Sequence, residues 1–235
     1  MTRFVDLRER VVRANRALVD AGLVVLTFGN ASAADREAGV IAIKPSGVAC
    51  GDLRPEDVPI VDLVSGAIVD GTQRPSSDTP THVVLYRAFP EVGGVVHTHS
   101  PFATAWAQAC RDLPCLGTTH ADHFRGSVPV TRALTPEEIA GEYEGQTGAV
   151  ILATLAERGA DPLELPAVLV ASHGPFAWGA DVEHAVENAV ALEAVAASAF
   201  RALELAGSLD AISDELLSRH FDRKHGAAAY YGQST

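Results

Sequence analysis

The 235-residue sequence has few cysteines, few positive charges and no long apolar run free of charge. Its three cysteines include no C-x-x-C pair, which excludes a disulfide framework and a cysteine-based zinc site. The chain has 18 Lys and Arg against 30 Asp and Glu. The resulting net charge of −12 disfavours a nucleic-acid partner. The most apolar long segment, residues 185–205, contains four charged residues and predicts no membrane span. The charged first 20 residues lack the apolar core of a signal peptide, so we expect a cytoplasmic protein.

Hydrophobic residues make up 47% of the chain, which is enough for one large core. The periodicity predicts helices at 5–20, from 79 onward, and at 101–109, 135–158, 181–205 and 214–224. It predicts strands at 23–27, 40–43, 58–63, 67–71, 93–100, 127–131, 165–174 and 176–179. These elements predict an α/β protein with a mixed sheet covered by helices, in one domain of residues 1–235 with a tail at 226–235.

Two apolar segments end in histidine. His97 and His99 close the segment GGVVHTHS, and His173 closes the segment AVLVASH. Residues two apart on a strand share a face, so the first two imidazoles can converge on one ion. An H-x-H pair also occurs at strand ends without any metal, but two apolar strands that both end in histidine favour a metal site.

A carboxylate would complete a four-ligand set, and Asp78 in the segment SSDTP is the best candidate. Asp is equally common before a helix in proteins that bind no metal. Three imidazoles and one carboxylate suit Zn²⁺, and they leave Mn²⁺, Co²⁺ and Ni²⁺ open.

Several turn residues have the chemistry of an anion site, since backbone N–H groups at helix starts and glycine turns favour phosphate. Each is more typical of a plain turn when taken alone, but together, beside a metal pattern, they predict a phosphate site. The candidates follow predicted strands or precede a helix: Gly29, Asn30, Lys44, Ser46, Gly47, Ser76 and Ser77.

Two further segments contain candidate acids and bases. Asp122 in the polar run TTHADH could transfer a proton, although a carboxylate in such a run is more often simply solvated. Tyr230 and Tyr231 lie near the C-terminus, and the residues alone indicate no role for them.

The sequence resembles the L-ribulose-5-phosphate 4-epimerases, a family of the class II aldolase/epimerase superfamily, from about residue 5 to Gln233. The resemblance lies in the runs TFGNAS, IKPSGV, PSSDTPTH, GGVVHTHS, GTTHADHF, GEYEGQTG, SHGPFAWG and RKHGAAAYYGQ. It implies a three-layer α/β/α fold, a homotetramer and one divalent metal per subunit, usually zinc.

The resemblance also implies roles for single residues. The family's metal ligands match Asp78, His97, His99 and His173, and its acid/base pair matches Asp122 and Tyr231. Glu144 and His220 match positions near the family's site, and Phe28 and Cys50 are neighbouring departures from its pattern. The family's phosphate contacts match Gly29, Asn30, Ser46, Gly47, Ser76 and Ser77, with Lys44 close by.

The reaction implied is epimerisation of L-ribulose 5-phosphate at C4 to D-xylulose 5-phosphate, by retro-aldol cleavage and re-addition, with the metal as Lewis acid. One alternative is a class II sugar-phosphate aldolase that releases its aldehyde. Another is a non-catalytic metal-binding assembly protein. The breakdown pathway, arabinose or ascorbate, stays open.

Tyr231 lies four residues from the C-terminus, and a short tail cannot hold a phenol in place unaided, because ordering its backbone costs roughly 1–2 kcal/mol per residue. In a cyclic homotetramer, the surface of a neighbouring subunit can order it. We therefore expect Tyr231 to serve the metal centre of an adjacent subunit, with His220 on the same segment.

Overall fold

A computed structural model describes residues 4–227 and 229–230 of the chain. The strands are β1 (Asn30–Asp35), β2 (Val40–Ile43), β3 (Ile60–Asp62), β4 (Ile68–Asp70), β5 (Gly94–His97), β6 (Ala167–Leu169) and β7 (Pro175–Gly179). The α-helices are α1 (Val5–Asp20), α2 (Thr79–Ala88), α3 (Pro101–Gln108), α4 (Thr118–Ala121), α5 (Pro136–Ala140), α6 (Tyr143–Arg158), α7 (Val182–Ala206) and α8 (Asp214–His225). Two short 3₁₀ turns lie at Cys50–Asp52 and Pro55–Asp57.

The strands form one seven-stranded sheet in the order β4-β3-β2-β1-β5-β7-β6. Every pairing between these strands is antiparallel. A mixed sheet was expected; within the described residues its parallel component reduces to a single bridge between Val130 and Leu169. The register sets His97 on β5 opposite Asn30 on β1 and opposite Phe176 on β7.

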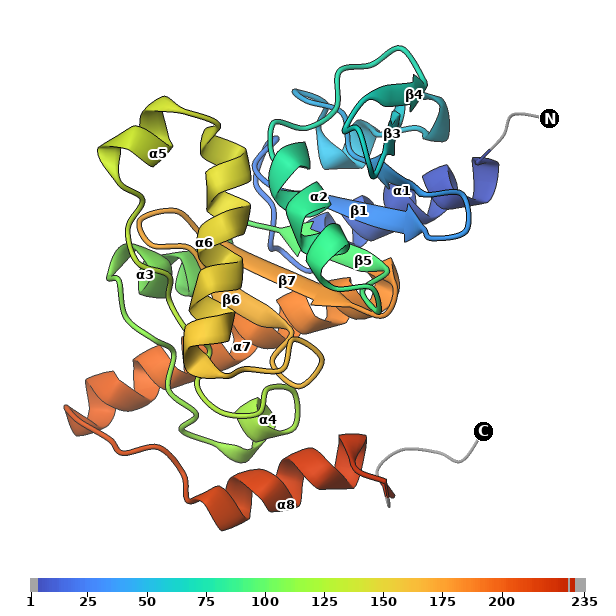
Figure 1. Cartoon of the computed structure of the whole chain (residues 1–235). Coiled ribbons are helices and arrows are strands. Elements are labelled where there is room, and N and C mark those ends of the chain that lie inside the picture. The colour runs from blue at the N-terminus through green and yellow to red at the C-terminus, as the bar shows by residue number, and fades with distance from the viewer. Residues whose placement is uncertain (1–3, 228, 231–235) are drawn as a thin grey trace.

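Helices cover both faces of the sheet, as the expected three-layer arrangement requires (Figure 1). Successive side chains of β1 point to opposite faces of the sheet, so neighbouring residues contact different helical layers. Ser32 points to α2, where its hydroxyl lies 2.7 Å from His82 Nδ1 and 2.8 Å from Tyr86 Oη. On the opposite face, Asn15 of α1 bonds both ways with the Ala31 backbone. Helix α6 packs against α2 in one layer, and α7 packs against α1 and the sheet in the other.

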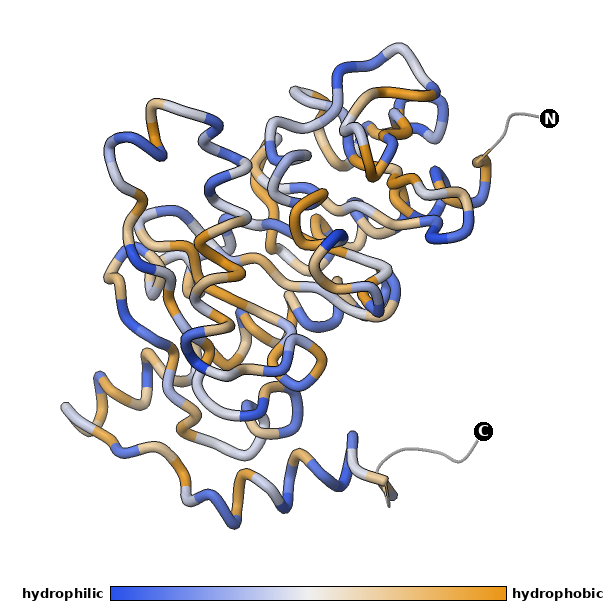
Figure 2. Tube along the Cα trace, in the orientation of Figure 1, coloured by the Kyte–Doolittle hydropathy of each residue, from blue (hydrophilic) through white to orange (hydrophobic). Residues whose placement is uncertain are grey.

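The buried core lies along these two interfaces. Figure 2 shows apolar residues concentrated on the strands and on the helix faces that meet them, and mostly hydrophilic residues on α8. Phe221 is the one residue of α8 whose exposure falls to the level of the core, at 4%. Helix α8 is therefore held more by polar contacts than by apolar burial. No helix in the described ranges combines the length and apolarity that crossing a bilayer requires.

Most predicted elements form, with four corrections. The expected strand at 165–174 shortens to β6, Ala167–Leu169, because the chain turns at Ser172, whose φ is 60°. The expected strand at 23–27 is wrong, because this segment turns at Leu26, whose φ is 57°, and β1 begins only at Asn30. The expected strand at 127–131 makes only isolated bridges, through Val128 and Val130. The expected helix from 135 to 158 is broken at Gly141 into α5 and α6.

Candidate metal and phosphate site

Three histidines converge at one end of β5. Ligand atoms of His97, His99 and His173 all lie within 4.8 Å of one another, and we call these residues the histidine cluster. His97 is the last residue of β5, and His99 lies two residues past the strand end. His173 follows β6 in the tight connection to β7. The antiparallel pairing of β5 with β7 brings the two histidine segments together.

The ring of His97 has a defined tautomer. Its Nδ1 lies 2.9 Å from the carbonyl oxygen of Pro175, which can only accept, so Nδ1 carries the proton and Nε2 has a free lone pair. That Nε2 faces His99 Nε2 at 3.1 Å. In a tetrahedral zinc site with Zn–N bonds of about 2.05 Å, two nitrogen ligands lie about 3.3 Å apart. The donor set therefore fits a divalent metal.

The three imidazoles are held in the neutral form that binds metals. Burial lowers the pKa of His97 to about 3, despite the attraction of Asp78. Burial also lowers the pKa of His99 and of His173. The ring of His97 stacks on Phe176 with centroids 4.3 Å apart, which fixes its orientation.

Asp78 lies beside the histidine cluster at the start of α2. Its Oδ2 accepts a hydrogen bond of 2.7 Å from Asn30 Nδ2. Burial raises the pKa of this carboxyl, but His97, His82 and the Asn30 amide lower it more, so the carboxylate is ionised. A carboxylate beside three neutral imidazoles supplies one negative charge, which would neutralise half of the charge of a divalent ion.

A cavity of 470 Å³ opens over these groups. Its lining combines the three histidines and Asp78 with hydroxyls, a lysine and glycine backbone. The lining residues are Thr27, Phe28, Gly29, Asn30, Lys44, Ser46, Gly47, Ser76, Ser77, Asp78, His97, His99, Tyr143, Glu144 and His173. All seven predicted phosphate residues and all four predicted metal ligands thus line one cavity, although the group whose ligand atoms lie within 4.8 Å of one another contains the three histidines and not Asp78. Glu144 joins them from the first turn of α6.

Two of the phosphate segments are joined side by side. The Ser76 N–H donates to the Lys44 carbonyl at 3.0 Å, and the Ser46 N–H donates to the Arg74 carbonyl at 2.9 Å. Lys44 is buried, and burial lowers the pKa of its ammonium. A cation with few protein partners and a hydroxyl-rich wall suit an anionic ligand.

Gly29 has no room for a side chain. Its φ is 103°, and a Cβ there would lie 2.7 Å from the carbonyl oxygen of His97. The glycine therefore lets the turn before β1 pass directly beside the ligand-bearing end of β5.

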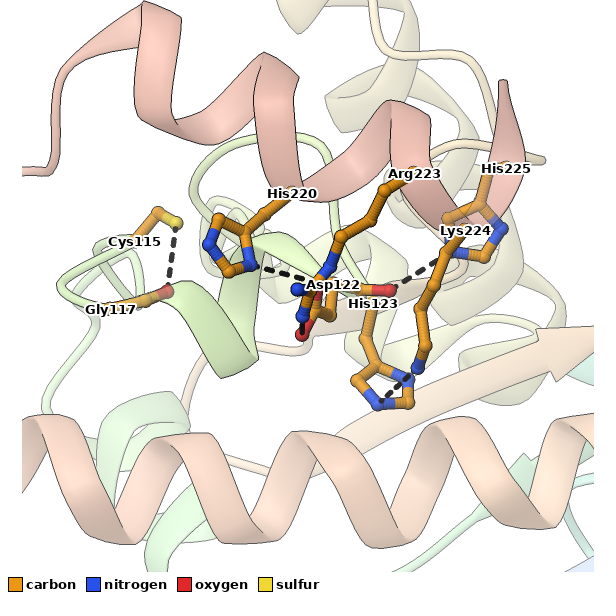
Figure 3. Close-up of polar contacts among 8 residues, drawn as sticks. All are labelled: Cys115, Gly117, Asp122, His123, His220, Arg223, Lys224 and His225. Atoms are coloured by element: carbon orange, nitrogen blue, oxygen red, sulfur yellow. Dashed lines mark hydrogen bonds and ion pairs between the residues drawn. The ribbon is translucent and has the colours of Figure 1, made fainter. Parts of the chain in front are cut away.

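Asp122 lies elsewhere, between α4 and α8 (Figure 3). Arg223 donates to it twice, from Nε to Oδ1 at 3.0 Å and from Nη2 to Oδ2 at 2.7 Å. His220 Nδ1 lies 3.1 Å from Oδ1, and His225 Nε2 donates to the Asp122 carbonyl at 2.9 Å. Lys224 Nζ lies 3.4 Å from His123 Nε2. We call these six residues the Asp122 cluster.

The Asp122 carboxylate is therefore not a simple solvated group. Only 13% of its side chain is exposed. Burial raises its pKa, but the hydrogen bonds and charges of Arg223 and His220 lower it more. Within the described residues, neither Asp122 nor His220 lines the 470 Å³ cavity. In Figure 1, α4 and α8 lie at the opposite side of the molecule from the start of α6, where Glu144 lines it.

Tyr231 lies outside the described residues. The N–H of its neighbour Tyr230 donates to the Arg223 carbonyl at 3.0 Å, so the described end of the chain lies on α8. Thr27 and Tyr143 also line the cavity, and the sequence pattern predicts no role for either. Each lies close to a predicted site residue, Thr27 in the run TFGN and Tyr143 in the run GEYEG. This closeness in sequence is the one feature that could have pointed to them.

Similarity to known proteins extends over almost the whole chain. Residues 9–200 match the model of the class II aldolase and adducin N-terminal domain. The L-ribulose-5-phosphate 4-epimerase UlaF of Salmonella paratyphi B (strain ATCC BAA-1250 / SPB7) is 53% identical over 227 residues, covering 97% of this chain and 98% of that protein. The protein of the same name from Salmonella typhi has the same identity and coverage.

Solved structures show the same fold. An L-fuculose 1-phosphate aldolase superposes with a TM-score of 0.77 at 23% identity, covering 93% of this chain and 95% of that one. The L-fuculose-1-phosphate aldolase from Thermus thermophilus superposes with a TM-score of 0.67 at 26% identity, covering 88% and 98%.

Proposed function

This chain belongs to the class II aldolase and adducin N-terminal domain family, and on that premise we propose that it is an L-ribulose-5-phosphate 4-epimerase. This isomerase inverts C4 of L-ribulose 5-phosphate and yields D-xylulose 5-phosphate. The observation that supports it is one cavity that combines three neutral imidazoles with a phosphate-type lining. The identity to the Salmonella epimerases favours this reaction over others of the family.

The metal would be held by His97, His99, His173 and Asp78. When bound, a divalent ion such as Zn²⁺ or Mn²⁺ supplies Lewis-acid polarisation of the substrate carbonyl. His97 is fixed for this purpose by its bond to Pro175 and by its stacking on Phe176. Asn30 orients the carboxylate of Asp78 through its side-chain amide.

The phosphate would bind between the turn at residues 44–47 and the segment that leads into α2. Ser46, Ser76 and Ser77 offer hydroxyls there, Lys44 offers a positive charge, and the backbone at Gly29 and Gly47 can approach the ligand closely. These contacts matter for epimerisation, because C3–C4 cleavage separates the substrate into two fragments. The phosphorylated aldehyde must stay bound while it turns to present its other face.

The proton transfers need groups on both faces of C4. Asp122 and Tyr231 are our candidates, with His220 hydrogen-bonded to Asp122 and Glu144 in the cavity wall as secondary ones. Asp122 and His220 lie outside the cavity of their own subunit. We infer a homotetramer in the cytoplasm, in which the Asp122 cluster and Tyr231 complete the site of a neighbouring subunit.

The test follows the fate of the two-carbon fragment. Purified protein loaded with Zn²⁺ or Mn²⁺ is incubated with L-ribulose 5-phosphate, and the products are identified by NMR. We expect D-xylulose 5-phosphate to accumulate without free glycolaldehyde phosphate. Accumulation of the free aldehyde would instead identify an aldolase, and absence of both products would refute catalysis on this substrate.

A further inference from the structure

We propose that Glu193 is a positioning residue for the histidine cluster. Its carboxylate holds helix α3, which follows His99 directly and contacts the segment of His173. The inference rests on the proposed metal site and concerns a residue that does not line the cavity.

Glu193 bonds the first turn of α3 with both carboxylate oxygens. Oε1 accepts from the Phe102 N–H at 2.8 Å, and Oε2 accepts from the Ala103 N–H at 2.9 Å. Ser100, the residue at the helix cap, makes no side-chain capping bond of its own. Glu193 therefore satisfies two backbone donors that the helix leaves open, at the positive end of its dipole.

Helix α3 connects two of the three imidazoles. Only Ser100, which is 1% exposed, separates His99 from the first helical residue. At the far end of the helix, the Ala107 carbonyl accepts from the Ser172 N–H at 3.0 Å, and His173 is the next residue. A displacement of α3 would therefore move both histidine segments.

Glu193 ties this helix to the layer that supports the third imidazole. It belongs to α7, which packs on β5 and β7, the strand pair that holds His97 and its partner Pro175. A second bond between the same helices runs from Trp106 Nε1 to the Ala196 carbonyl at 3.1 Å. The carboxylate thus sets where α3 sits relative to β5, and with it the spacing of the three ring nitrogens.

The alternative is that Glu193 only caps a helix and adds stability. The two roles differ in what its loss does to metal binding, because partners behind a ligand shell change metal affinity by about 10- to 100-fold. Co²⁺ is a suitable probe, since its visible absorption spectrum reports the geometry of the ligand nitrogens.

The experiment compares full-length Glu193→Ala and Glu193→Gln with the wild-type protein, all stripped of metal. Co²⁺ affinity is measured by competition with a chelator, and the visible spectrum is recorded without substrate. We expect an affinity loss of roughly 10- to 100-fold for Glu193→Ala, with altered absorption bands. Glu193→Gln keeps one acceptor, so we expect a smaller loss.

Asp181→Ala is the matched control. Asp181 caps α7 through the His184 N–H at 2.8 Å, near the other end of β7 from Pro175. We expect it to lower Tm while Co²⁺ affinity and spectrum stay at wild-type values. If both Glu193 variants also keep wild-type affinity and spectrum, Glu193 is a stabilising cap and the proposal is wrong.

If Glu193→Ala fails to fold, Glu193→Gln alone tests the proposal, and wild-type Co²⁺ affinity and spectrum in that variant would again show it to be wrong. Failure of the proposed function has a different signature, because wild-type protein would then bind Co²⁺ and leave L-ribulose 5-phosphate unchanged. Wild-type protein that binds no Co²⁺ would overturn both the metal site and the role of Glu193.

Discussion

The histidine cluster and the Asp122 cluster hold titratable groups by opposite means. The histidine cluster lies at the ends of central strands, its rings are neutral, and its best-fixed member, His97, is 1% exposed. The Asp122 cluster lies between a one-turn helix and the last described helix, and it is held by ion pairs. Burial therefore sets the protonation state of the histidine cluster, whereas side chains of helix α8 set that of Asp122.

This difference explains why the two clusters can have different partners. The sheet register brings the members of the histidine cluster together within one chain. In the proposed homotetramer, the Asp122 cluster would instead serve the site of a neighbouring subunit. The following experiments test whether the two clusters act on one reaction and how independently each is held.

The largest effect is expected from His97→Asn. Loss of a ligand removes several kcal/mol of transition-state stabilisation, so we expect activity to fall by roughly 1,000-fold or more, together with bound metal. Activity and metal content are measured on the same sample. His184→Asn, which changes a histidine with a 62% exposed side chain, is the control and should alter neither. Full activity in metal-free wild-type protein would contradict the metal site.

Asp122→Asn should cost about 100- to 10,000-fold in rate, the range typical of an acid or base, with metal content unchanged. The amide keeps the shape of the carboxylate but cannot exchange the proton. Asp222→Asn is the control, since it removes another carboxylate of the same region, paired with Arg125 at 3.2 Å. An unchanged rate for Asp122→Asn would leave the carboxylate with the structural role of holding α8.

Subunit mixing tests whether the C-terminus of one subunit serves the metal site of another. Tyr231→Phe and Asp78→Ala should each be nearly inactive alone. In hybrid oligomers, a Tyr231→Phe subunit keeps its metal and can receive an intact C-terminus from an Asp78→Ala neighbour, so part of the activity should return. Hybrids verified by native mass spectrometry that stay as inactive as both parents would exclude action between subunits.

The smallest effect is expected when the pH is lowered, and it concerns the stability of helix α8. The pKa of Asp122 is lowered in the folded protein, so its ion pair stabilises the fold above the ordinary Asp value of about 3.9 and the contribution disappears as pH falls through the lowered value. We therefore expect α8 to loosen selectively below about pH 4, measured as a loss of amide hydrogen-exchange protection at residues 214–225, with each rate compared with the intrinsic rate at the same pH.

In Asp122→Asn, the same amides should exchange faster already at neutral pH, and the acid-dependent step should shrink. The Arg125–Asp222 pair remains in both proteins, so the difference between them isolates Asp122. Equal exchange profiles for the two proteins would show that the Asp122 ion pair does not hold α8, and would leave that role to the Arg125–Asp222 pair and to Phe221.

The histidine cluster could be predicted from the sequence because its signal is local. Strands β5 and β6 both pair antiparallel with β7, which lies between them, so they run in the same direction and their histidine-bearing ends lie at the same edge of the sheet. The partners of Asp122 could not be predicted in this way. His220 and Arg223 lie 98 and 101 residues away, and no periodicity relates them to a short polar run.

The misplaced first strand has a related cause. Residues 23–27 are mostly apolar or β-branched, a composition typical of strands, yet they are not a strand and they turn at residues 26–27. Strand β1 is instead Asn-Ala-Ser-Ala-Ala-Asp, a sequence with little intrinsic strand preference. Its small side chains suit the centre of the sheet, where Asn15 of α1 reaches the Ala31 backbone. Packing by distant helices, rather than local propensity, decides this strand.

The strand order also has a consequence for how the chain folds during synthesis. On one side of β1, strands β2, β3 and β4 follow it in sequence, through two short loops and the longer connection at residues 44–59, so this meander closes at little entropic cost. On its other side, β1 pairs with β5, which begins about 60 residues later, and β5 needs β7, about 80 residues later still. A nascent chain therefore presents β1 as an unpaired edge until β5 emerges, and the histidine cluster is complete only after residue 173 has left the ribosome.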